Sequence, residues 1–157
     1  MSTQAPILQH VQTARDRDHS HIGSRADRGS GWFYWIAGLS VINSLVMFFG
    51  INWGFALGLA VNDFITVALE DSSRGLALVL ELLVIGLFVG LGVFASRKQR
   101  WAFVVGGLLF ALDTLLMLLE FSIIGVIIHL VALWAFFKGF QACGEWKKAC
   151  RERGIPV

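Results

Sequence analysis

Three ionisable side chains lie inside long apolar stretches of this 157-residue chain: Glu81, Asp113 and His129. Asn43 is a further polar residue in such a stretch. A charge at the centre of a bilayer costs about 2.5–3.5 kcal/mol on insertion scales, so residues of this kind need a partner or a role. A carboxylate and an imidazole can exchange protons, because burial and neighbouring charges change how readily each ionises.

The apolar stretches have the length of membrane spans. The chain is 56% hydrophobic and 15% charged, whereas soluble domains carry about 25% charged residues. A bilayer core about 30 Å thick needs about 20 apolar residues in a helix. The sequence therefore predicts an all-α, integral membrane four-helix bundle, residues 32–141, with Glu120–Ser122 as the last reversal. The predicted spans are about 32–51, 75–95, 101–119 and 122–141.

The segment 54–69, between the first and second spans, is apolar but contains Asn62 and Asp63. It is short for a complete crossing, and stretches of this length are more often interfacial or re-entrant. We expect an additional interfacial or re-entrant helical segment here, on the side opposite to the chain ends.

The two ends of the chain are polar. Residues 1–31 are rich in charge and lack apolar periodicity, which is typical of a disordered tail. Residues 142–157 form a basic tail. Four spans place twelve of the thirteen lysines and arginines on one side, leaving Arg74 opposite. Basic residues collect on the cytoplasmic side, so we expect both tails to be cytoplasmic. The compactness of the chain and the absence of a signal peptide lead us to expect a plasma (inner) membrane of bacterial type.

The polar residues of the spans lie at similar predicted depth. At about 1.5 Å per residue, Glu81, Asp113 and His129 each lie about 9–10 Å from the nearest outer span end, and Asn43 about 12 Å. We therefore predict one polar layer in the outer half of the bundle. Arg74 lies on the same side of its helix as Glu81, seven residues earlier, and is a candidate partner for Glu81 or for a ligand from outside.

Asp63 is a second charge near the outer face and is grouped with Arg74 as a partner charge.

The polar layer has three candidate roles: a proton relay, a cation site, or hydrogen bonds that fix helix register. One histidine and two carboxylates suit Fe or Mn better than structural Zn, but the residues do not identify a metal or cofactor. Measured interhelical hydrogen bonds average about 0.6 kcal/mol, so the gain from fixing register is modest.

Other features bear on partners. Gly86 and Gly90 form a small-x-x-x-small pair that lets helices approach closely. The net charge of +2 is too small to indicate nucleic acid binding. The sequence contains no serine hydrolase, zincin or phosphate-loop motif. Two hypotheses remain nearly level: a proton- or cation-handling membrane protein, as a homo-oligomer, and a non-catalytic accessory or assembly subunit of a larger membrane complex. An intramembrane metal enzyme is a more distant third.

Overall fold

The computed structural model describes residues 4–49, 59–69, 74–119 and 123–155, and nearly all of these residues are helical. No strand occurs among them, which confirms the all-α prediction. Helices α3 and α4 begin and end within one residue of two predicted spans, and α5 begins one residue after a third and continues well beyond it. The helices are α1 (Gln4–Phe48), α2 (Ala60–Ala68), α3 (Arg74–Ser96), α4 (Arg100–Leu119) and α5 (Ile123–Glu152).

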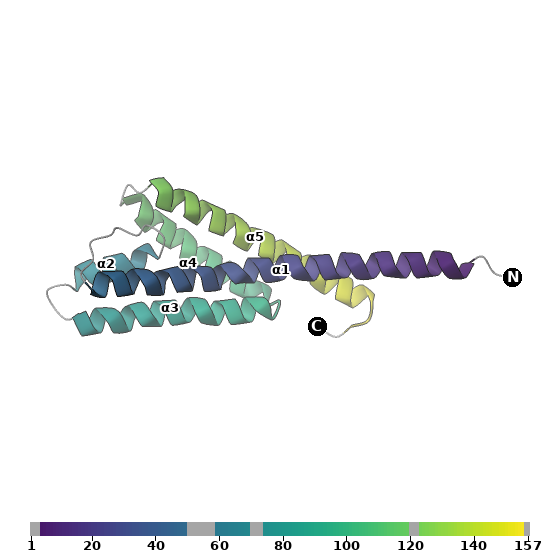
Figure 1. The fold of residues 1–157 in the computed structure, drawn as a ribbon, viewed down its shortest axis with the longest axis horizontal. Coiled ribbons are helices and arrows are strands. Elements are labelled where there is room, and N and C mark those ends of the chain that lie inside the picture. Colours follow the sequence, from purple (N-terminus) through teal and green to yellow (C-terminus); the bar gives the residue numbers. More distant parts are fainter. Residues whose placement is uncertain (1–3, 50–58, 70–73, 120–122, 156–157) are drawn as a thin grey trace.

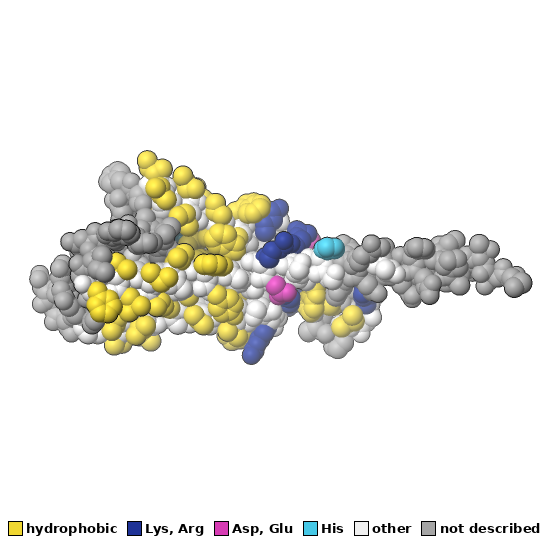
Figure 2. Space-filling model, viewed as in Figure 1, with side chains coloured by type: hydrophobic (Ala, Val, Ile, Leu, Met, Phe, Trp, Pro, Cys, Tyr) yellow, Lys and Arg dark blue, Asp and Glu magenta, His cyan; other side chains and the backbone are white. Residues whose placement is uncertain are grey.

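Within the described ranges, α3, α4 and α5 are long and apolar enough to cross a membrane. Only 33–39% of the residues in their most apolar windows are buried, so most of these apolar side chains face outward. Such a surface suits lipid and not water. Figure 2 shows apolar side chains covering one part of the molecule and basic side chains gathered where that apolar surface ends. The chain thus has the character of a helical membrane protein.

The long helices lie along one another, with α1 packed against both α3 and α5, and α4 packed against α5 and α3 (Figure 1). The N-terminal part of α1 extends past the other helices, and α2 lies at the end farthest from the N-terminus (Figure 1). Short as it is, α2 contacts α1, α3 and α4. It therefore lies against the helices that carry Asn43, Glu81 and Asp113, three of the four predicted polar residues.

The centre of the bundle is aromatic. Phe33 of α1 is fully buried, and its ring lies 4.2 Å from that of Phe136, 5.8 Å from Phe103 and 6.3 Å from Phe88, measured between centroids. Phe110 joins this cluster through Phe88 and Phe136. Tilted and offset ring pairs contribute about 0.5–1.5 kcal/mol beyond the area they bury. One ring from α1, α3 and α5 and two from α4 thus hold the four long helices together.

Glycines allow the closest helix contacts. A Cβ built on Gly29 would lie 2.6 Å from the Cα of Gly139, where α1 crosses α5. A Cβ on Gly106 would lie 2.2 Å from the ring of Phe33. By contrast, nothing lies within 4 Å of a Cβ built on Gly86 or Gly90. The close approach predicted for that pair is therefore not made to another helix in the described part of the chain.

The structure differs from the disordered tail predicted for residues 1–31, because α1 is helical from Gln4 onward. Contacts with the end of α5 and with Lys98 explain the order of residues 25–30 in this helix. Ala26 and Ser30 are buried, Arg25 pairs with Glu145 of α5 at 3.2 Å, and Asp27 pairs with Lys98. These contacts lie far apart in sequence, so local composition did not reveal them.

Most of the basic C-terminal segment is helical. Helix α5 continues to Glu152, and Ala142, Cys143 and Cys150 are buried in this part. Both cysteines are free thiols. The end of α5 and the adjoining part of α1 therefore form a helical pair that continues the bundle past its apolar region.

Candidate functional site

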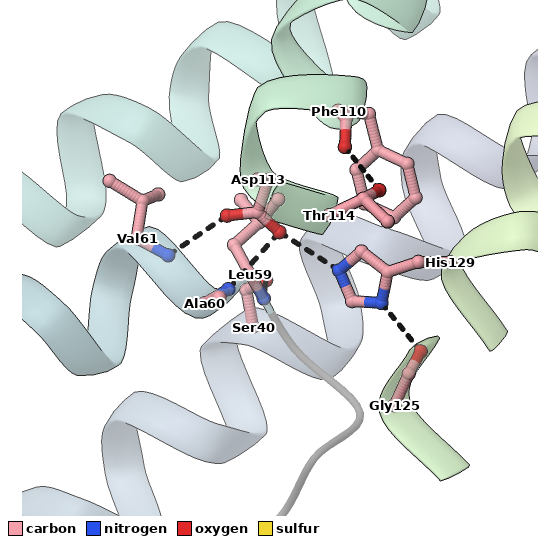
Figure 3. A network of polar contacts seen from close by, with 9 residues as sticks. All are labelled: Ser40, Leu59, Ala60, Val61, Phe110, Asp113, Thr114, Gly125 and His129. Atoms are coloured by element: carbon pink, nitrogen blue, oxygen red, sulfur yellow. Dashed lines mark hydrogen bonds and ion pairs between the residues drawn. The ribbon is translucent and has the colours of Figure 1, made fainter. Parts of the chain in front are cut away.

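Asp113 of α4 is the centre of a buried polar network (Figure 3). Its side chain is 3% exposed. Oδ1 accepts a hydrogen bond from the backbone N–H of Val61 at 2.8 Å, and Oδ2 accepts one from the N–H of Ala60 at 3.1 Å. Oδ2 also lies 2.9 Å from Nε2 of His129. One carboxylate thus connects α4, α2 and α5.

These bonds satisfy the first turn of α2. The first N–H groups of any helix lack partners within the helix, and leaving them buried and unpaired is costly. Here Asp113 accepts from Ala60 and Val61, and Ser40 Oγ of α1 accepts from Leu59 at 3.0 Å. The positive end of the helix dipole also favours a carboxylate at this position. Asp113 therefore acts as a cap supplied by a different helix.

His129 of α5 is held at both ring nitrogens. Nδ1 lies 2.8 Å from the carbonyl oxygen of Gly125, and a carbonyl can only accept, so Nδ1 carries a hydrogen. Nε2 faces Asp113, which leaves one proton to be shared between Nε2 and Oδ2. The ring of Phe110 stacks on the imidazole, with the ring centroids 4.5 Å apart and an interplanar angle of 2°. The pair is neutral overall when this single proton is present.

Glu81 of α3 belongs to a second network. Its Oε1 contacts the hydroxyl of Thr66 in α2, and Thr66 Oγ1 also lies 3.1 Å from the carbonyl oxygen of Asn62. The Asn62 side chain donates through Nδ2 to Ser44 Oγ of α1 at 3.4 Å. Asn62 is 1% exposed and Glu81 is 4% exposed. We call Glu81, Thr66, Asn62 and Ser44 the Glu81 cluster.

The predicted layer is thus brought together in part. Asp113 and His129 form a direct pair, whereas Glu81 contacts Thr66 of α2. Asn43 is buried in α1, between the two serines that bond to the α2 segment.

In the described part of the chain, no three His, Cys, Asp or Glu side chains gather closely enough to hold a metal ion. The Fe or Mn site hypothesised from Glu81, Asp113 and His129 is therefore not formed by these residues.

The two partner charges predicted near the outer face are not tested. Asp63 belongs to α2 and Arg74 is the first residue of α3, but their side chains lie outside the described part of the chain. The reversal predicted at Glu120–Ser122 also lies outside the described residues.

Four of the residues that bond in these networks were not predicted to be part of the site: Ser40, Ser44, Asn62 and Thr66. Serine and threonine in a membrane helix can bond their own helix backbone, as Thr114 does to the Phe110 carbonyl, so their presence alone carries little signal. A usable signal was present in the spacing. Ser40 and Ser44 lie one turn apart on α1, and Asn62 and Thr66 lie one turn apart on α2, so each pair shares a face.

Fold and site together define a helical membrane protein with a buried carboxylate–imidazole pair that caps a short internal helix. No family model, no curated protein and no solved structure matches the chain. Its function must therefore be inferred from the chemistry of the two networks.

Proposed function

We propose that the chain crosses the membrane four times, through the second half of α1 and through α3, α4 and α5, with α2 as a re-entrant helix. Ser40 and Asp113 lie about 12 and 9 Å from the ends of α1 and α4, at about 1.5 Å per residue. Their bonds to Leu59, Ala60 and Val61 support a start of α2 at this depth, as a re-entrant helix requires. The gathering of basic side chains beyond the apolar surface supports a cytoplasmic location for both chain ends.

Cysteine labelling tests this topology. In a variant with Cys143 and Cys150 replaced by alanine, single cysteines at Gln99 and Arg153 should react with a membrane-impermeant maleimide from the same side of oriented vesicles. A cysteine at Ile123 should react only from the other side, because an odd number of spans separates it from Gln99. Labelling of Gln99 and Ile123 from one side would contradict the proposal.

We further propose that the protein handles protons. The proton shared by Asp113 and His129 would control whether the start of α2 stays bound to Asp113. The observation that carries this proposal is the double use of one carboxylate. The Oδ2 atom that faces His129 also accepts from Ala60, and Oδ1 accepts from Val61. A change in the charge of this group therefore acts on α2 directly.

The direction of the effect follows from hydrogen-bond counting. Adding a second proton places one on Asp113 as well as on both nitrogens of His129. The carboxyl group then loses its charge and one of its good acceptor positions, so its cap on α2 weakens, and the imidazolium loses its counter-ion. Acidification is thus expected to release α2, whereas removal of the shared proton leaves an ionised cap in place.

Accessibility of Ala60 provides the test, because this residue is fully buried at the start of α2. In the cysteine-free background, an Ala60→Cys variant in liposomes should react slowly with maleimide at neutral pH and faster as the pH falls. Each rate is divided by the rate for the same variant unfolded in detergent, which removes the pH dependence of the reagent. Adding Asp113→Asn should make labelling fast and insensitive to pH.

A Thr114→Val change is the matched control, since Thr114 is buried next to Asp113 in the sequence and its hydroxyl donates to the Phe110 carbonyl of its own helix. It should leave the pH profile of labelling unchanged. A profile that is flat in the parent variant, or that persists unchanged with Asp113→Asn, would exclude proton control of α2. An internal pH dye in the same liposomes reports whether the movement is accompanied by proton flux.

A second candidate function is that of a non-catalytic accessory or assembly subunit. The hydrogen bonding of the Asp113–His129 pair favours this candidate, because both nitrogens of His129 and both oxygens of Asp113 are bonded within the chain. The apolar hollow on α5, lined by Ile127, Leu130, Val131 and Trp134, contains neither residue. If liposomes show neither proton flux nor pH-dependent labelling, this candidate is preferred, and crosslinking in membranes should then identify a partner.

A further inference from the structure

The Glu81 cluster contains more hydrogen-bond acceptors than its donors can satisfy. Asn62 Oδ1 is buried and has no hydrogen-bond partner. Thr66 has a single hydroxyl hydrogen, yet its Oγ1 lies against two oxygens, the Asn62 carbonyl and Glu81 Oε1. Among the described side chains, no lysine, arginine or histidine pairs with Glu81. Buried polar groups in folded proteins are nearly always paired, so these deficits need an explanation.

All the deficits are on oxygen and would be relieved by one positive species. Thr66 lies one turn after Asn62 on α2, so both side chains occupy the face that meets Glu81 of α3 and Ser44 of α1. The oxygens on this face are a carboxylate, an amide carbonyl and two hydroxyls. Hard cations prefer oxygen ligands of these types.

We propose that the Glu81 cluster is a binding site for a small monovalent cation of the Na⁺ type. Glu81 supplies the negative charge, and Asn62 Oδ1, Thr66 Oγ1 and Ser44 Oγ supply neutral ligands. One carboxylate balances one monovalent charge, whereas a divalent ion would leave a net positive charge buried in the membrane, which is costly. The site is distinct from the Asp113–His129 pair, and its test does not require that this pair controls α2.

The test uses full-length protein in detergent, with NaCl compared against choline chloride at equal ionic strength. A ligand that binds only the folded state raises its stability, so NaCl should raise the thermal unfolding midpoint of wild type and choline chloride should not. Binding of radioactive Na⁺ should reach one ion per chain. Glu81→Gln should abolish both effects, and Asn62→Ala should weaken binding by about tenfold, equivalent to about 1.4 kcal/mol.

Two further variants keep the test decisive. Thr114→Val lies outside the cluster and should bind Na⁺ as wild type does. Asn62→Asp adds a second carboxylate, so it should shift the preference from Na⁺ toward Ca²⁺ or Mg²⁺. Absence of Na⁺ binding in wild type overturns the proposal, and this outcome can be read even if Glu81→Gln fails to fold. It would indicate instead that Glu81 carries a proton and that water binds Asn62. Equal Na⁺ binding in wild type and Glu81→Gln overturns it as well.

Discussion

Replacing Asp113 with alanine is expected to cost about 3–5 kcal/mol of unfolding free energy, the range measured when one member of a buried ion pair is removed. The substitution leaves the N–H groups of Ala60 and Val61 without an acceptor and removes the partner of His129 Nε2. The Ala60 N–H and the His129 ring cannot turn to water, because these two residues are 0% and 1% exposed. Unfolding by sodium dodecyl sulfate in mixed micelles, followed by circular dichroism, measures the change.

Asp113→Asn should cost less than Asp113→Ala. The carboxamide oxygen can accept from one of the two N–H groups, and its NH₂ group can donate to a neutral His129. Thr114→Val provides the reference, because it removes only a hydroxyl bonded within α4 and should cost about 1 kcal/mol or less. If Asp113→Ala is no more destabilising than Thr114→Val, then Asp113 does not cap α2 in the folded protein.

The lengths and positions of the apolar helices could be predicted from the sequence, because hydropathy in a bilayer is a strong and local signal. Predicted spans 75–95 and 101–119 correspond to α3 and α4 to within one residue at each end. The burial of Glu81, Asp113 and His129 was also predictable, since charged residues in apolar helices avoid lipid. These conclusions need only the chain's composition and periodicity.

The pairing of the polar residues could not be predicted in the same way. Depth placed four residues in one layer, but the contacts depend on the path of α2, whose N–H groups lie at that depth. Backbone N–H groups are present at every residue and therefore give no sequence signal. The segment 54–69 was recognised as unusual through Asn62 and Asp63, yet Asp113 binds the backbone N–H groups of Ala60 and Val61 at the start of α2. The polar layer holds a helix end in place, which side-chain periodicity does not encode.

A similar limit applies to the first thirty residues. Their composition predicted disorder, because few of them are large and apolar. Order between Ala26 and Ser30 instead depends on small residues that allow a close crossing with α5. Small side chains bury little area, so hydropathy underestimates their contribution when the partner helix is unknown.

Gly29→Leu is therefore expected to disrupt the bundle at the crossing of α1 and α5. Even the Cβ atom of an alanine would lie 2.6 Å from the Cα of Gly139, and this contact is with backbone, which cannot rotate away. The helices must separate, which also loosens the contact of Phe103 with Gly139. Overpacking costs about 1–3 kcal/mol for modest insertions, and a leucine should exceed that range. Detergent unfolding and size-exclusion chromatography should report a less stable, more aggregated protein.

The matched substitution is Gly90→Leu, in a helix of the same bundle but at a position with open space around the added Cβ. Glycine is about 1 kcal/mol less favourable than alanine in a helix, and leucine is also a good helix former, so this variant should be as stable as wild type or more stable. The pair of variants separates two roles for glycine that the sequence alone does not distinguish. A destabilised Gly90→Leu protein with a normal Gly29→Leu protein would show that α3, and not the α1–α5 crossing, makes the close helix contact, in an assembly of more than one chain.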